Sequence, residues 1–127
     1  MPHVEKISPV LVVHEVESCA QFWERLGFVR TAQVPHGETL GFVILERDAL
    51  EVMYQSLASI REDNAASADA LFVGGSCLFV EVDDLDGAAR AIDGAEIVVP
   101  RRTTFYGMME FGVKDPGGHV IVFAQKV

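Results

Sequence analysis

The elements that the sequence predicts occur in the same order twice. In the first half, β-branched and apolar residues predict a strand over 7–13. Over 17–26 the apolar residues follow the i, i+3, i+4, i+7 spacing of one helical face, which predicts a helix with Ser18 as N-cap and Gly27 at its end. Three more strands are predicted over 28–34, 39–46 and 50–55. The first half is therefore βαβββ.

The second half repeats this order. A strand is predicted over 77–82 and a helix over 85–92, which Asp93 and Gly94 end. The remaining strands are predicted over 95–99, 106–113 and 119–125. The two halves align where each helix ends and the next strand starts, although few residues are identical. Two such units can pair into eight strands that curl around a cavity with the helices outside. We therefore predict an α+β fold with a cup-shaped eight-stranded sheet.

The chain length fits one domain. A chain of 127 residues can bury roughly two thirds of the surface that its unfolded form exposes. We divide this domain into module one over 5–55, a connector over 56–76 and module two over 77–126. Within the connector, 56–70 is rich in Ala, Ser, Asp, Asn and Glu, which favours a short exposed helix or a loop.

The charge of the chain disfavours two classes of partner. Ten Lys and Arg against nineteen Asp and Glu give a formal charge of -9, which repels phosphate backbones and anionic membrane surfaces. We expect no nucleic-acid partner and no membrane partner. The acidity either serves solubility or attracts a cationic ligand, and charge alone does not decide between these.

The chain is expected to be cytoplasmic. Its longest apolar runs are far shorter than the ~20 residues that cross a bilayer, and its first ten residues lack the pattern of an export signal. Cys19 and Cys77 are widely separated and have no CxxC spacing. In a reducing compartment we expect both to remain thiols, without a disulfide.

Two stretches resemble the signature sequences of a known superfamily. FWERLGF over 22–28 follows SPVLVVHEVES, and YGMMEFGVKDPGGHVIVFA covers 106–124. In this order they are similar to the glyoxalase, bleomycin-resistance and extradiol-dioxygenase proteins, the vicinal oxygen chelate (VOC) superfamily, and the antibiotic-resistance branch that binds bleomycin is the closer match. The resemblance covers nearly the whole chain. It implies a single VOC domain over 1–127 and a homodimer with each pocket at the interface.

The resemblance also implies four positions at which enzymes of the superfamily bind a divalent metal, one on the first and one on the last strand of each half. Such enzymes typically have His and Glu or Gln there. The corresponding residues of this chain are Ser8, Glu51, Cys77 and Val122. Glu51 is a normal ligand and a Cys77 thiolate could join a zinc site, but serine is a poor ligand and valine is none. We expect no metal and no cofactor.

The histidines and the hairpin turn are interpreted without chemistry. Each histidine lies where a solvated imidazole is the ordinary outcome: in the N-terminal tail, after a strand, in a turn or after the hairpin glycines; they are His3, His14, His36 and His119. Residues 115–118, Asp-Pro-Gly-Gly, form a tight turn in which proline presets φ and glycine supplies positive φ. Trp23, on the apolar helix face, is expected in the core.

Alternation along the strands predicts which side chains face the cup. Those two apart from the metal-equivalent positions share their face, and the family pattern adds three residues of the strand before the hairpin. The inward set is Ser8, Val10, Val12, Glu51, Met53, Cys77, Phe79, Glu81, Met108, Glu110, Gly112 and Val122. Phe105 and Tyr106 could form an aromatic lip. We expect Glu81 at a solvated edge, whereas Glu51 and Glu110 either contact ligand or are paired structurally.

The resemblance implies a metal-free binding protein that sequesters a cationic or aromatic drug-like compound or metabolite. No catalytic residue is assigned. The expected ligand-binding residues are Val10, Glu51, Met53, Cys77, Phe79, Phe105, Tyr106, Glu110 and Val122. The alternative is an enzyme, either a metal-dependent lyase, isomerase or dioxygenase with atypical ligands, or an acid/base catalyst. In the second case an apolar cup would raise the pKa of Glu51 or Glu110 toward neutrality. A purely structural module would leave the cavity unused.

Overall fold

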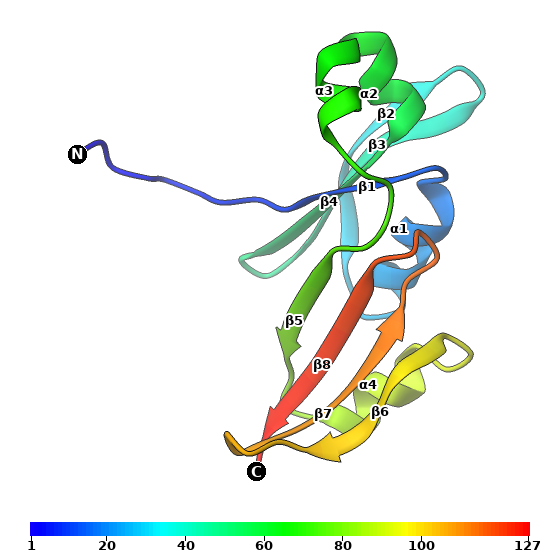
Figure 1. Cartoon of the computed structure of the whole chain (residues 1–127). Helices are drawn as coiled ribbons and strands as arrows, with labels where there is room; N and C mark the ends of the chain where they lie inside the picture. Colours follow the sequence, from blue (N-terminus) through cyan, green and yellow to red (C-terminus); the bar gives the residue numbers. More distant parts are fainter.

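Two four-stranded sheets form the framework of the protein, whose computed structural model describes residues 1–127. The first unit comprises β1 (Val10–Val13), α1 (Glu17–Glu24), β2 (Val29–His36), β3 (Thr39–Arg47) and β4 (Leu50–Ser56). The second comprises β5 (Cys77–Glu81), α4 (Leu85–Ala91), β6 (Glu96–Thr103), β7 (Met108–Lys114) and β8 (Val120–Lys126). The α+β class and the repeated βαβββ order are confirmed (Figure 1).

The two sheets have the same topology. Their strand orders are β1-β4-β3-β2 and β5-β8-β7-β6. In each unit the first strand pairs with the last in parallel, and the other neighbours are antiparallel. The eight expected strands are all present, but no ladder joins the two sheets, so they do not form one continuous sheet. Figure 1 shows the first unit in the upper half of the view and the second unit below it.

One core lies against the helical faces of both sheets. Strand residues that alternate toward α1, such as Leu45 and Tyr54, share a cluster with those that face α4, such as Phe123. Trp23 is buried in this cluster, as predicted. A helix covers this face of each sheet. The opposite face has no helical cover except where the connector reaches it.

The start of α1 differs from the expectation. The N-cap residue is Val16, and Ser18 makes no cap with its own side chain. Instead the Glu15 carboxylate accepts a hydrogen bond from the Ser18 amide at 3.0 Å. This carboxylate satisfies an unpaired N–H group at the helix start and also complements the helix dipole. Gly27 follows the helix with a φ of 84°, which agrees with its predicted role as the end.

The first strand begins three residues later than predicted. Pro9 has no N–H to continue the ladder on β4, although its carbonyl still accepts from the Met53 amide at 3.0 Å. Residues 1–9 therefore form an extended arm, which Figure 1 shows pointing away from the body of the protein.

The β6–β7 hairpin also differs from the prediction. β6 extends to Thr103 instead of ending at 99, and β7 begins at Met108 instead of 106. The Thr104 hydroxyl accepts from the Met108 amide at 3.0 Å, and Gly107 has a φ of 82°. A side-chain hydrogen bond and a positive φ together close the turn, so Tyr106 lies in the turn and not in the strand.

The connector contains two short helices, α2 (Leu57–Asp63) and α3 (Ala65–Ala70). The Ser56 hydroxyl and the Asn64 side chain cap their N-termini. Ile60 and Ala68 are buried against Val12, so the connector covers one end of the first sheet instead of being wholly exposed. None of the helices has the length and hydropathy of a membrane-spanning segment.

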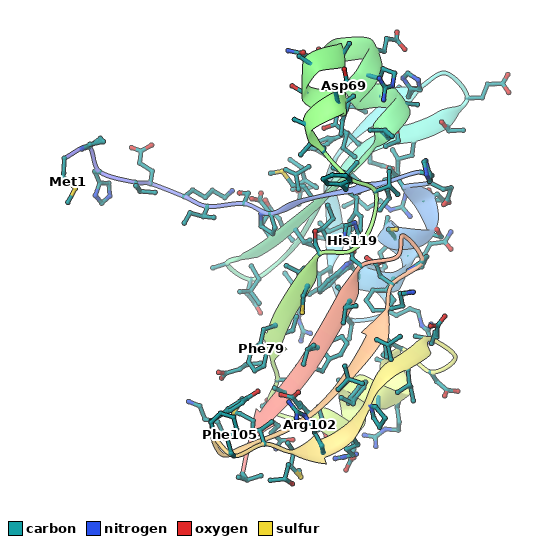
Figure 2. The ribbon with its side chains drawn as sticks, in the orientation of Figure 1. Met1, Asp69, Phe79, Arg102, Phe105 and His119 are labelled. Carbon is teal, nitrogen blue, oxygen red and sulfur yellow. The ribbon has the colours of Figure 1, made fainter.

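His119 joins the two units, contrary to the expectation that its imidazole is solvated. The ring is buried, and Nε2 donates to the Val12 carbonyl at 2.8 Å while Nδ1 accepts from the Ser76 amide at 3.1 Å. Figure 2 shows His119 at the junction of the units. The prediction was wrong because the second unit packs its hairpin against β1, a long-range contact that a local pattern does not reveal.

The hairpin turn is part of the same junction. Asp115 is buried, and its carboxylate accepts from the amides of Gly117 and His119. A Cβ at Gly117 would collide with Val13 and approach Cys19, so only glycine permits this close packing. The turn is thus structural, as interpreted, but it also fixes one unit against the other.

Candidate functional site

The helix-free face of the second sheet is the first part of the candidate site, and we name it the second open face. Strand register places Phe79, Val122 and Gly112 side by side across β5, β8 and β7. The next row consists of Glu81, Ala124, Glu110 and Arg102. These side chains share one face, as alternation predicted for Phe79 and Glu81 on β5 and as the family pattern predicted for Glu110 and Gly112 on β7. The face therefore combines an apolar row with a charged one.

The centre of this face is buried although no helix covers it. Val122 and Glu110 on the two central strands are almost inaccessible, whereas Phe79 on the edge strand is 52% exposed. Cys77 and Glu81, on the same edge strand, are exposed, the latter as expected. Figure 2 shows Phe79 on β5, and Arg102 and Phe105 near the β6–β7 hairpin. Phe105 is fully exposed and contacts Tyr106 edge to face, with ring centroids 5.1 Å apart.

Glu110 is the only charged side chain buried in the floor of the second open face. Its Oε1 accepts from the Tyr106 hydroxyl at 2.8 Å, and its Oε2 lies 3.2 Å from both Nε and Nη2 of Arg102. The Glu110 side chain is 5% exposed, but that of Arg102 is 59% exposed. The hydrogen bond from Tyr106 to Glu110 raises the pKa of the phenol above its usual value, so the phenol remains a donor.

The face of the first sheet opposite α1, which the connector helices cover only near Val12, carries the other candidates, and we name it the first open face. Val10 and Met53 are neighbours in register on β1 and β4, and Val10 is 44% exposed. Glu51 lies two residues before Met53 on the same face. Its Oε2 accepts from the Ser8 hydroxyl at 2.5 Å and pairs with the Lys6 ammonium at 2.9 Å. The arm is thus tied to the sheet through Glu51.

These contacts change the expected protonation of Glu51. The hydrogen bond from Ser8, followed by that from Lys6, lowers the pKa of Glu51 below its usual value. The acid/base alternative needs this pKa to be raised toward neutrality, whereas both neighbours stabilise the ionised form of Glu51. Glu51 is therefore poorly suited to act as a general base near neutral pH.

The four metal-equivalent residues form two pairs on different sheets. Ser8 and Glu51 are hydrogen-bonded in the first unit, and Cys77 and Val122 lie on neighbouring strands of the second. Val122 has no donor atom, and Ser8 and Lys6 already occupy Glu51 Oε2. No group of three or more His, Cys, Asp or Glu is arranged to hold a metal ion. The residues present do not fit the divalent metal that enzymes of the predicted superfamily use.

The main cavities of the single chain lie elsewhere. The largest of the five main cavities has a volume of about 610 Å³. It is lined mostly by polar groups from α1, the start of β6 and the hairpin. A more apolar cavity of about 380 Å³ lies between α4 and β6. None of the five includes any of the nine predicted ligand-binding residues. One chain spreads these residues over two open sheet faces, on which Glu110 and Val122 are buried, and does not enclose them in a cup.

Sequence reasoning missed the two cations of the site. Arg102 pairs with Glu110 because β6 is shifted against β7 by irregular register between Ile97 and Arg102. Lys6 reaches Glu51 because the arm leaves β1 next to β4. Neither pair was predicted, although basic residues near both carboxylates were visible in the sequence.

Comparison with known proteins identifies relatives of the fold. A family model described as the Glyoxalase/Bleomycin resistance protein/Dioxygenase superfamily matches residues 1–123. A solved glyoxalase/bleomycin resistance protein/dioxygenase from Nocardioides has a TM-score of 0.76 at 19% identity, and the match covers 100% of this chain and 87% of that one. No curated protein matches the sequence.

Two further solved structures concern bleomycin. A bleomycin resistance determinant encoded on the transposon Tn5 has a TM-score of 0.68 at 20% identity, with 97% of this chain and 98% of that chain covered. A bleomycin-binding protein solved in complex with bleomycin has a TM-score of 0.64 at 20% identity, with 98% and 100% covered. At this level of identity the likeness establishes the fold alone.

Proposed function

The chain belongs to the glyoxalase/bleomycin resistance protein/dioxygenase superfamily, and we propose that it is a metal-free binding protein that sequesters a cationic or aromatic small molecule. The observation that carries this proposal is the second open face, where a buried carboxylate lies beside an apolar row and an aromatic turn. Apolar walls with few polar groups are typical of small-molecule sites. The metal-equivalent residues offer too few donors for the metal-dependent alternative, and the lowered pKa of Glu51 disfavours that residue as an acid/base catalyst.

The ligand contacts both open faces in this proposal. From the second open face and its hairpin we assign Cys77, Phe79, Phe105, Tyr106, Glu110 and Val122, and from the first open face Val10, Glu51 and Met53. Phe79 and Phe105 are large exposed apolar side chains, which bury their area when a flat molecule stacks on them. The two carboxylates set the charge of the ligand.

We further propose that two copies of the chain complete each pocket. Val10 and Phe79 leave apolar surface exposed on the two open faces, and neither face is enclosed by its own chain. Contiguous exposed apolar surface is typical of an interaction site, and two-fold dimers are the commonest assembly. In the proposed homodimer, the first open face of one copy lies against the second open face of the other.

We place this dimer in the cytoplasm. Cys19 and Cys77 are both free, and Cys77 is exposed on the second open face. A reducing compartment keeps an exposed thiol unpaired, which supports this location.

Bleomycin is a suitable first probe, because a protein of this fold has been solved with it, and Cys77 provides a reporter. Protein treated with a chelator is reacted with a thiol reagent in the presence of increasing bleomycin. Burial raises the pKa of Cys19, so that thiol reacts only after unfolding, whereas Cys77 reacts in the native protein. The proposal predicts that bleomycin slows the Cys77 reaction to a saturable limit.

The control for this experiment is Phe79→Ala, which removes the exposed ring two residues from Cys77 and is expected to weaken the protection. Cys77→Ser identifies the fast-reacting thiol. An unchanged Cys77 rate at every bleomycin concentration would argue against a bleomycin-like ligand on this face.

A further inference from the structure

The contacts of Glu110 point to a built-in counterion. We propose that a cationic group of the bound molecule replaces Arg102 against Glu110, so that Arg102 is the resident stand-in for the cation of the ligand. This inference rests on the proposed function, because it specifies which ligand group the second open face receives. The expected ligands are amines, amidines and guanidines that carry an apolar body.

The two partners of this ion pair differ sharply in their freedom. Glu110 lies on β7 between β6 and β8, and its side chain is 5% exposed. Arg102 lies on the edge strand β6, and its side chain is 59% exposed. An exposed guanidinium on a flexible stem can move into water at small cost, whereas the buried carboxylate stays in place. The pair is therefore a fixed anion with an exchangeable cation.

The two oxygens of the Glu110 carboxylate have different partners. Tyr106 donates to Oε1 at 2.8 Å, and Arg102 contacts Oε2 only. When Arg102 leaves, Tyr106 still holds Glu110, and Oε2 becomes available to an incoming N–H donor. A buried carboxylate without any cation is costly, so the site favours a ligand that restores the charge.

The surroundings define the rest of the ligand. The Glu110 row lies next to the row of Phe79, Val122 and Gly112. The apolar body attached to a cation at Oε2 then lies along this row, from Gly112 across Val122, with Phe79 at the far edge of the sheet. An anion would face the buried charge of Glu110 instead, which makes an acidic ligand unsuitable for this position.

The first open face repeats the arrangement. Glu51 is 8% exposed in its side chain, and its cationic partner Lys6 is 62% exposed. Each sheet thus carries one carboxylate with a buried side chain that is paired with an exposed lysine or arginine. Glu51 is also held by Ser8 through the same oxygen that contacts Lys6, so the vacated position is less open there.

The test compares a cation with its neutral counterpart. Amide NMR spectra of the full chain are titrated with 1-naphthylmethylamine and with 1-naphthylmethanol, which differ in charge and little in shape. The variants are Arg102→Gln, Glu110→Gln and the control Arg101→Gln. Arg101 is the neighbouring arginine, is about half exposed and pairs with Asp86 at 2.6 Å. The control changes the net charge equally without touching Glu110.

We expect opposite effects from the two members of the pair. Arg102→Gln should tighten amine binding by about two- to fivefold, because the ligand no longer competes with an exposed ion pair. Glu110→Gln should weaken it by about tenfold, because a charge-assisted hydrogen bond is lost. Arg101→Gln should leave it unchanged, and the alcohol should bind all four proteins alike.

Several outcomes would overturn the inference. Weaker amine binding by Arg102→Gln would mean that Arg102 itself contacts the ligand. Equal amine and alcohol binding in every variant would contradict the inference while leaving the proposed binding function intact. If neither compound binds the unaltered protein and bleomycin gives no protection of Cys77, the proposed function fails as well. Should Glu110→Gln not fold, the sign of the Arg102→Gln effect still decides.

Discussion

The Tyr54 hydroxyl on the first sheet donates a hydrogen bond to the Asp115 carboxylate in the hairpin of the second, with 2.5 Å between Oη and Oδ2. Tyr54 also accepts from Trp23 Nε1 at 2.8 Å. Burial, followed by the nearby Asp115 charge, raises the pKa of Tyr54, so the phenol stays protonated and remains a donor. Asp115 thus has partners for both oxygens, and the polar link joins the two units through the core.

Tyr54→Phe should destabilise the protein. The change leaves the Asp115 oxygen and the Trp23 N–H without their partner in a buried site, at a cost of about 1–3 kcal/mol. Urea unfolding followed by Trp23 fluorescence measures this. Tyr106→Phe is the matched control and should cost less, because Tyr106 is half exposed and Glu110 keeps its ion pair with Arg102. Equal losses in the two variants would contradict the structural importance of the link.

His119→Leu should loosen the contact between the units. The Ser76 amide loses its acceptor and the Val12 carbonyl loses one of its two donors, so we expect a loss of about 1–3 kcal/mol. Hydrogen exchange should accelerate at Gly74 and Ser76 before it does in the strands. His14→Leu, at an exposed position, should have no comparable effect. Unchanged exchange at Gly74 and Ser76 would show that the imidazole is dispensable.

Acid should release the N-terminal arm. The pKa of Glu51 is lowered in the folded protein, so its contribution is present above the unfolded pKa of about 4.3 and is lost as pH falls through the lower folded value. The pKa of Lys6 is raised, so its contribution is lost only at strongly alkaline pH. Amide shifts of Lys6 and Ser8 should follow a transition below pH ~4.3 that Glu51→Gln abolishes. A midpoint above that pH would contradict the assigned ion pair.

Light scattering after size exclusion should give twice the chain mass of 13.9 kDa. A carboxylate in the apolar part of the proposed interface is costly, so Val10→Asp should give the monomer mass. Leu50→Asp introduces the same charge at an exposed position on β4, on the face of the first sheet opposite to Val10. It should leave the mass unchanged. A monomer mass for the unaltered chain would reject the proposed homodimer.

The sequence predicted most elements because strand alternation and helical spacing are local properties. β4, for example, was expected over 50–55 and spans Leu50–Ser56. It could not predict that His119 is buried, since the buried environment is made by Val12 and Ser76 from other parts of the chain. The bulges that bring Arg102 opposite Glu110 depend on packing as well as on sequence, so the sequence did not predict this ion pair either.

The same distinction applies to the candidate site. Alternation from Cys77 placed Phe79, and the family pattern placed Glu110 and Val122, on one face correctly, because period two holds wherever a strand is regular. The closure of the cup was expected within one eight-stranded sheet, whereas the chain presents two separate open faces. How two units are oriented depends on their whole contact surface, which no short motif encodes.

Metal-free binding on the second open face is tested by an amide NMR titration of chelator-treated protein with bleomycin. Saturable shifts are expected at Phe79, Glu110 and Val122 without any added metal. No saturable shift, or shifts confined to the cavity between α4 and β6, would contradict it.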